Sequence, residues 1–153
     1  MSAPIVTRGA SVRGPLAIGT YSTCHGSISL VIGRLHHVIL DCRDPQQVAD
    51  FYARLLGQPV TYRSDDFCVV ARDETTSGIA FQLARNHVAP SWPDPKVPQQ
   101  SHLDVMVDDL ETARKNVLTI GARHLQGDVY ADPAGHPFCL IHRPSWAPSI
   151  GSE

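Results

Sequence analysis

The stretch LHHVILDCRDPQQVADFYARLLG, residues 35–57, predicts a strand followed directly by a helix. Strand-forming residues run up to Arg43, and Asp44-Pro45 then has the form of an N-cap followed by proline in the first helical turn. Apolar residues next recur with helical spacing and so mark one buried face: Val48, Phe51, Tyr52, Leu55 and Leu56. Gly57 suits the end of this helix.

After this helix, the sequence predicts three short strands and then a connector. The strand candidates are separated by turn-forming Asp, Thr, Ser and Gly residues, and they cover 59–63, 67–71 and 78–84. Prolines then recur through residues 86–99. Proline continues neither a helix nor a central strand, so we expect a semi-rigid, extended connector here.

The stretch SHLDVMVDDLETARKNVLTIGA, residues 101–122, repeats the strand–helix pattern. Asp108 or Asp109 is the expected N-cap, and Glu111 would complete a capping box with Asp108. The predicted buried stripe of this helix comprises Leu110, Ala113, Val117 and Leu118, with Gly121 after its end. Weaker strand signals follow at 122–126 and 128–131, then a turn at 132–135, and finally the strand HPFCLI, residues 136–141.

The two copies align closely. His37 and Asp44 are seven residues apart, as are His102 and Asp109. Near the end of each copy, Phe81-Gln82-Leu83 aligns with Phe138-Cys139-Leu140. The unit is therefore strand, helix, three strands, and it occurs twice. This order predicts an α+β fold of two βαβββ modules, each burying one sheet face against its helix.

The repeat sets the expected domain boundaries. We predict a single domain over about 34–146, with module 1 at about 34–85, the connector at 86–99 and module 2 at about 100–146. Residues 1–33 are rich in Ser and Gly and precede the first acidic residue, Asp41, so we expect a flexible extension. Residues 147–153 form a short tail.

Composition narrows the function classes. With a net charge of −2 and a pI of about 6.4, the chain has no basic surplus for nucleic acid or an anionic membrane. Neither a membrane-spanning stretch nor a secretory apolar segment is visible, so we expect a cytoplasmic protein. The four cysteines, at 24, 42, 68 and 139, have neither zinc-ribbon nor disulfide-scaffold spacing, and we expect them reduced.

Strand alternation divides the predicted sheets into two faces. The helix-packed face is expected to be wholly apolar, with Val38, Leu40, Cys42, Ile79, Phe81, Leu83, Leu103, Val105, Val107, Phe138 and Leu140. The other face carries His37, Ile39, Asp41, Ala80, Gln82, His102, Asp104, Met106, Cys139 and Ile141. That mixture contains no Lys or Arg. It is more typical of a lined cavity than of a solvated sheet face, which is the alternative.

Two βαβββ modules, a histidine in the first strand of each, and the segment DPAGHPFCLI at 132–141 resemble the vicinal oxygen chelate superfamily, and in particular its small glyoxalase-like and bleomycin resistance proteins. This resemblance covers about residues 34–146. It implies curved mixed sheets around a concave cleft. It also implies that first-strand and fourth-strand positions of each module face a shared site, and these positions are His37, Gln82, His102 and Cys139.

Metal-using relatives usually carry carboxylates at the fourth-strand positions, where this chain has Gln82 and Cys139. The neutral amide cannot act as a general base, so the usual chemistry is not expected. A set of His37, His102, Cys139 and Gln82 could still bind a divalent ion such as Zn, Fe, Ni or Mn. Asp104 could supply an acid one strand step farther along, and Cys139 could alternatively act as a nucleophile with a histidine base.

We therefore expect a protein that binds a small organic molecule in the cleft, with no cofactor or an unknown one. The predicted cleft residues are His37, Ile39, Gln82, Trp92, His102, Asp104, Met106, Cys139 and Ile141. The alternatives are a metal-dependent lyase or dioxygenase-like enzyme with an altered His/His/Cys site, and a scaffold or regulatory domain without a ligand. The resemblance also implies a homodimer, formed side by side or by module exchange.

Overall fold

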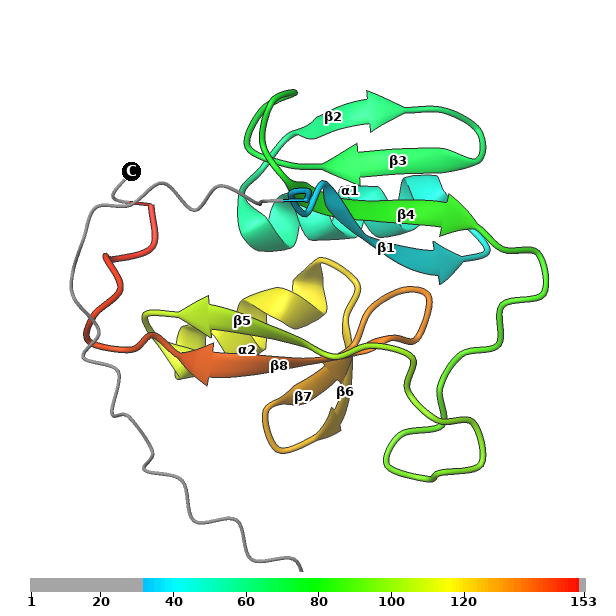
Figure 1. Ribbon diagram of the computed structural model, residues 1–153. Coiled ribbons are helices and arrows are strands. Elements are labelled where there is room, and N and C mark those ends of the chain that lie inside the picture. Colours follow the sequence, from blue (N-terminus) through cyan, green and yellow to red (C-terminus); the bar gives the residue numbers. More distant parts are fainter. Residues whose placement is uncertain (1–31, 152–153) are drawn as a thin grey trace, which may run out of the picture. The chain divides into compact units, whose positions relative to one another are not determined.

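The computed structural model describes residues 32–151, which contain two successive copies of one βαβββ unit (Figure 1). In module 1 the elements are β1 (His37–Cys42), α1 (Pro45–Leu56), β2 (Val60–Arg63), β3 (Phe67–Val70) and β4 (Gly78–Leu83). Their strand order is β1-β4-β3-β2, with β1 parallel to β4 and the other pairs antiparallel. The predicted extension at 1–33 lies almost wholly outside the described residues.

Module 2 repeats this topology. Its elements are β5 (Leu103–Val107), α2 (Leu110–Thr119), β6 (Arg123–Gln126), β7 (Val129–Ala131) and β8 (Pro137–His142). The strand order is β5-β8-β7-β6, and β5 again runs parallel to β8. The predicted α+β fold of two βαβββ modules is therefore confirmed. Neither α1 nor α2, the two helices in the described part of the chain, is long and apolar enough to cross a membrane.

Helix α1 begins and ends as its sequence predicts. The Asp44 side chain accepts a hydrogen bond from the Gln47 backbone N–H at 3.0 Å, and Pro45 occupies the first turn. Gly57 takes the left-handed conformation, with φ of 64°, that closes the helix. Thus three local signals, at Asp44, Pro45 and Gly57, determine the ends of α1.

The start of α2 differs from one prediction. Asp109 is the N-cap and accepts from the Glu111 N–H at 3.0 Å, so the capping box predicted for Asp108 is wrong. Asp108 instead pairs with Arg143 and accepts from the Ile150 N–H, which draws it away from the helix end. Leu118, predicted on the buried stripe, is 48% exposed, because only the Val117 side of this turn faces the sheet.

The connector is not extended as predicted. The Ser91 N–H donates to the Val97 carbonyl at 2.9 Å, and the Val97 N–H donates to the Ser91 hydroxyl at 2.8 Å. A further turn forms where the Asp94 N–H bonds to the Ser91 carbonyl at 2.7 Å. The prolines here are separated by Ser and Asp, whose side chains satisfy the turning backbone, so residues 91–97 close into a loop instead of a straight spacer.

The predicted helix-packed face is buried along most of its length, including Leu40, Cys42, Phe81, Val105, Phe138 and Leu140. Val38 is the exception, because it is 41% exposed. It lies near the start of edge strand β1, whereas α1 packs chiefly on β2, β3 and β4. Along β1, the side chains are therefore buried beneath α1 only from Leu40 onward.

A chain of aromatic rings joins the cores of the two modules. In module 1, Phe81 stacks on Tyr52 with ring centroids 5.1 Å apart, and Tyr52 meets Phe51 edge-on at 5.1 Å. Phe51 then contacts Phe138 of module 2 at 5.8 Å, and Phe138 contacts Tyr130 at 6.0 Å. All five rings belong to one buried cluster that spans both modules. The described modules therefore share a hydrophobic core.

Gly78, the strand partner of His37, has no room for a side chain. A Cβ at this position would lie 2.7 Å from the Ala71 Cβ and would clash with the Val70 carbonyl oxygen. We predict that Gly78→Ala lowers the free energy of unfolding by about 1–3 kcal/mol, the usual cost of overpacking. Gly33→Ala is the control, since a Cβ there meets nothing within 4 Å. Equal urea midpoints for the two variants would contradict the prediction.

Candidate functional site

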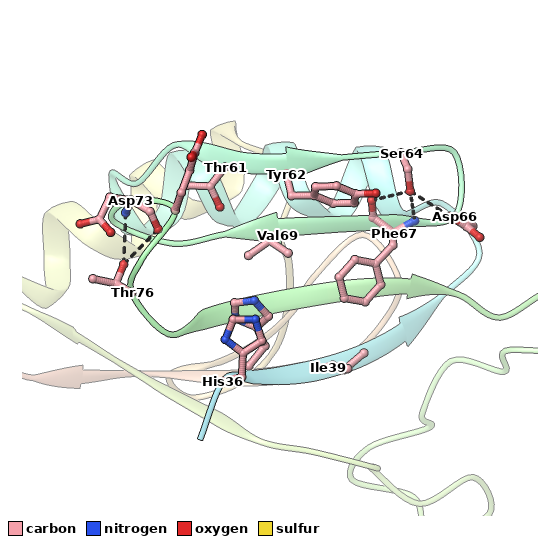
Figure 2. Close-up of a pocket in the computed structure, with 12 residues that line it drawn as sticks. His36, Ile39, Thr61, Tyr62, Ser64, Asp66, Phe67, Val69, Asp73 and Thr76 are labelled. Carbon is pink, nitrogen blue, oxygen red and sulfur yellow. Dashed lines mark hydrogen bonds between the residues drawn. The ribbon is translucent and has the colours of Figure 1, made fainter. Parts of the chain in front are cut away.

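The face of the module 1 sheet opposite α1 is hollowed into a cavity of about 850 Å³, called here the module 1 cavity (Figure 2). It is lined by residues of β1, β2 and β3, by the residue before β1, and by the turns before β3 and before β4. These residues are His36, His37, Ile39, Thr61, Tyr62, Ser64, Asp66, Phe67, Val69, Asp73, Glu74 and Thr76. None of them is Lys or Arg.

A row of side chains from four paired strands lies across the sheet beneath the cavity. Strand register places Ile39 beside Ala80, Ala80 beside Val69, and Val69 beside Tyr62. Ala80 is fully buried in this row and packs with Val69 and Phe67, which themselves line the cavity. Figure 2 shows Ile39, Val69 and Phe67 projecting to the same side of the sheet. The floor of the cavity is therefore apolar and partly aromatic.

Polar groups lie at the two ends of the cavity. The rings of His36 and His37 have centroids 3.7 Å apart, and His37 Nδ1 accepts a hydrogen bond from the Gly78 N–H at 3.2 Å. Burial, and then the neighbouring His36, lower the pKa of His37. Neutral His37 thus presents Nε2–H as a donor. Asp73 lies at the turn before β4, where hydrogen bonds from Thr75 lower its pKa and keep it ionised.

Module 2 carries a different polar group on the corresponding face. His102 Nε2 lies 3.2 Å from an Asp104 carboxylate oxygen, and Cys139 is the strand partner of Asp104. One donor atom from each residue lies within 4.8 Å of the other two. Burial, then the charges of Asp104 and Asp128, raise the pKa of the Cys139 thiol. No other trio of His, Cys, Asp or Glu donors in residues 32–151 is so closely grouped.

The structure does not assemble the four positions that the resemblance implied for a shared metal. His37 lines the module 1 cavity, whereas Gln82 lines a separate hollow of about 580 Å³ with Asp41 and Ser101. Along the parallel β1–β4 pair, His37 is level with Gly78 and Asp41 with Gln82. This offset of four residues corresponds to about 13 Å. His37 and Gln82 therefore do not fit one ion.

The predicted alignment of Gln82 with Cys139 is wrong. Cys139 pairs with Asp104, two residues after His102, and the residue two after His37 is Ile39, which pairs with Ala80. Ala80 is thus the structural counterpart of Cys139. The alignment error is two residues and so preserves strand alternation, which explains why face assignment alone could not detect it.

The remaining predicted cleft residues are distributed over several places. Ile39 lines both the module 1 cavity and the hollow around Gln82. Met106 and Ile141 are strand partners and half-buried on the module 2 face. Trp92 lies half-buried in the 91–97 loop and does not line the module 1 cavity. Trp146, which follows β8, is 80% exposed.

Sequence reasoning missed most of the module 1 cavity. Tyr62, Phe67 and Val69 line it, yet only the first and fourth strands of each module had been assigned to faces. The alternation of Phe67 and Val69 in the segment 67–71 carried the necessary signal. Thr76 and Asp73 could not have been found this way, since they come from an irregular turn.

Sequence comparison agrees with this topology. The fold and its two module faces define a protein of the glyoxalase/bleomycin resistance class. Residues 37–141 match the family described as "Glyoxalase-like domain", and the chain belongs to this family. No curated protein matches.

Solved structures with the same fold cover most of the chain. A glyoxalase/bleomycin resistance protein/dioxygenase family enzyme from Burkholderia phytofirmans is 17% identical with a TM-score of 0.57, covering 72% of this chain and 98% of its own. A glyoxalase-related enzyme from Fulvimarina pelagi is 18% identical with a TM-score of 0.56, covering 78% and 95%. The oxidase ChaP-H2 is 21% identical with a TM-score of 0.51, covering 79% and 100%. These similarities show the fold.

Proposed function

We propose that this glyoxalase-like protein binds a small organic molecule in the module 1 cavity, without the metal set typical of catalytic relatives. The observation that carries the proposal is the cavity itself. Its volume of about 850 Å³ lies in the range of ligand pockets. An apolar floor with a few polar groups at the ends is the usual composition of such pockets.

The lining residues indicate the kind of ligand. Phe67 and Tyr62 offer aromatic surface, with their rings 6.2 Å apart, and Ile39 and Val69 offer aliphatic surface. A ring or branched hydrocarbon part would pack on this floor. Neutral His37 at one end can donate a hydrogen bond. We infer that the ligand combines an apolar body with an acceptor group, and that it carries no strong negative charge, since Asp66, Asp73 and Glu74 line the same cavity.

A cavity-filling variant tests this proposal. Ile39 is 50% exposed, so Ile39→Trp should fill the cavity without disturbing the core. In a thermal-shift screen of small aromatic and alicyclic compounds, we expect hits that stabilise the wild type by about 2.7 kcal/mol at 100 times their Kd. The same compounds should give little or no shift with Ile39→Trp.

Leu118→Trp is the matched control, because Leu118 is 48% exposed on α2 and does not line the module 1 cavity. It should keep the wild-type response to each hit. A screen without any hit, or hits that stabilise Ile39→Trp as much as the wild type, would refute binding in this cavity.

The alternative function, a lyase or dioxygenase-like enzyme with an altered His/His/Cys site, requires His37 and His102 at one ion. His37 is instead engaged with Gly78 and lines the module 1 cavity, while His102 groups with Asp104. This separation of the two histidines does not support catalysis through such a set. The small-molecule proposal also includes two expectations from the sequence, a cytoplasmic location and a homodimer, and light scattering of the purified chain tests the second.

A further inference from the structure

We propose that a hollow between α1 and the end of α2 binds a small organic phosphate monoester, through the guanidinium groups of Arg54 and Arg123. This helix-side hollow has a volume of about 430 Å³. It shares no lining residue with the module 1 cavity, which lies on the sheet face opposite α1, so it does not depend on the ligand proposed there. The lining residues that matter here are Gln47, Arg54, Ile120, Arg123, Asp132 and Pro133.

The shared core of the two modules brings the arginines to one hollow. Gln47, Phe51 and Arg54 follow one another at spacings of four and three residues, so they lie on one side of α1. Phe51 is buried against Phe138 of module 2, and its two polar neighbours therefore flank the place where the modules meet. Module 2 supplies Arg123, the first residue of β6. The hollow thus receives one arginine from each module.

Both guanidinium groups have free donors. Within residues 32–151 the Arg123 guanidinium has no hydrogen-bond or ion-pair partner, and Arg54 uses only its Nε, which donates to the Asp50 carbonyl at 3.2 Å. Both residues are exposed, so a ligand can reach them from solvent. A guanidinium presents five N–H donors in a planar fork that matches phosphate oxygens. Most of these donors remain available at the hollow.

The nearby carboxylates do not neutralise the arginines. Asp132 is the one carboxylate among the lining residues, but it lies 2.8 Å from His136 Nδ1 and its side chain has no exposed surface. The carboxylate of Asp50, one helical turn before Arg54, pairs with Arg63 at 2.6 Å. The hollow is therefore positively charged, although the whole chain has a net charge of −2.

These charges indicate the class of ligand. A phosphate monoester carries about −1.5 to −2 charge at neutral pH, which matches two guanidinium groups, whereas a monocarboxylate matches only one. The Gln47 amide offers a further N–H donor. Ile120 and Pro133 are half-buried and provide apolar surface for the organic part. The volume of the hollow lies in the range of small-molecule pockets.

Calorimetric titration of the full chain with phenyl phosphate, at constant ionic strength, tests the proposal. Binding should saturate at one molecule per chain. Arg54→Gln and Arg123→Gln should each weaken it by roughly 10-fold or more, since each removes hydrogen bonds to a charged group. Inorganic phosphate, which lacks the apolar part, and benzoate, which has a single charge, should both bind more weakly. The two arginines belong to different modules, so the test stays informative if one variant fails to fold.

Arg85→Gln is the matched control, because it removes one positive charge from a residue that follows β4 and does not line the helix-side hollow. It should keep the wild-type affinity, and an equal loss in Arg85→Gln and Arg54→Gln would overturn the proposal. Ile39→Trp should also keep it, since loss of binding there would place the probe in the module 1 cavity. Absence of saturable binding, or phosphate or benzoate binding as tightly as phenyl phosphate, would overturn the proposal as well.

Discussion

Replacing Asp132 with alanine should lower the free energy of unfolding by about 3–5 kcal/mol, the cost of breaking a buried ion pair by removing one partner. Asp132 and His136 are only 4% and 2% exposed, and His136 Nδ1 lies 2.8 Å from the Asp132 carboxylate. The same carboxylate accepts the N–H groups of Ala134 and His136. The variant would leave the two buried His136 donors and the half-buried Ala134 N–H without this acceptor. Urea denaturation measures the loss.

The charge state of His136 follows from its two partners. Nδ1 faces the Asp132 carboxylate and Nε2 faces the Asp41 carbonyl at 3.0 Å. Both partners accept hydrogen bonds here, so both ring nitrogens must donate and the ring must be protonated. Burial alone would lower the pKa of His136, but the hydrogen bond and charge of Asp132, with Asp41 added, raise it above its ordinary value. His136 therefore joins module 2 to β1 of module 1 as a cation.

Asp132→Asn separates the ion pair from the backbone hydrogen bonds, since an amide oxygen still accepts. A raised folded pKa means that the ionic contribution is complete below the unfolded value of about 6.5 and is lost as the pH rises through the folded value. The difference in free energy of unfolding between the wild type and Asp132→Asn should therefore be largest at about pH 6 and smallest at about pH 9. The other ionisable groups near His136 are Asp41 and His87, whose ring lies 5.0 Å away. A difference that is flat or grows with pH would contradict a cationic His136.

Local signals predicted the elements well, for physical reasons visible at particular residues. Asp44, Pro45 and Gly57 fix α1 through backbone hydrogen bonding and torsion angles that need no distant partner. Strand alternation placed Leu40, Cys42, Phe81 and Leu140 in the core because a side chain's face depends only on its position in the strand. The internal repeat predicted the order of elements along the chain, strand, helix and three strands in each module, since two copies of one unit must each bury the same face.

The arrangement of the site depends on long-range interactions, which the alternation of side chains along a strand cannot predict. Gln82 was aligned with Cys139 two residues out of place because the true alignment depends on the register of β1 on β4. That register is set by pairing between residues about forty positions apart in the sequence. His136 was predicted only as the first residue of the last strand, yet its ring reaches the Asp41 carbonyl, ninety-five residues earlier. From the sequence Asp108 could cap α2, but in the structure its carboxylate pairs with Arg143. In each case a long-range partner determined the role of the side chain.

Phe138→Ala should remove about 3–5 kcal/mol of stability, the usual cost of truncating a buried aromatic residue. Phe138 is fully buried and is the module 2 ring that meets Phe51 of α1, so its loss opens a cavity where the modules join.

A double-mutant cycle of Phe51→Ala and Phe138→Ala should give a coupling energy of about 0.5–1.5 kcal/mol. Phe67→Ala is the control, since Phe67 belongs to a separate cluster. Paired with Phe138→Ala it should be additive within about 0.5 kcal/mol. Additivity of Phe51→Ala with Phe138→Ala, or separate unfolding transitions in the wild type, would mean that the two modules do not share one cooperative core.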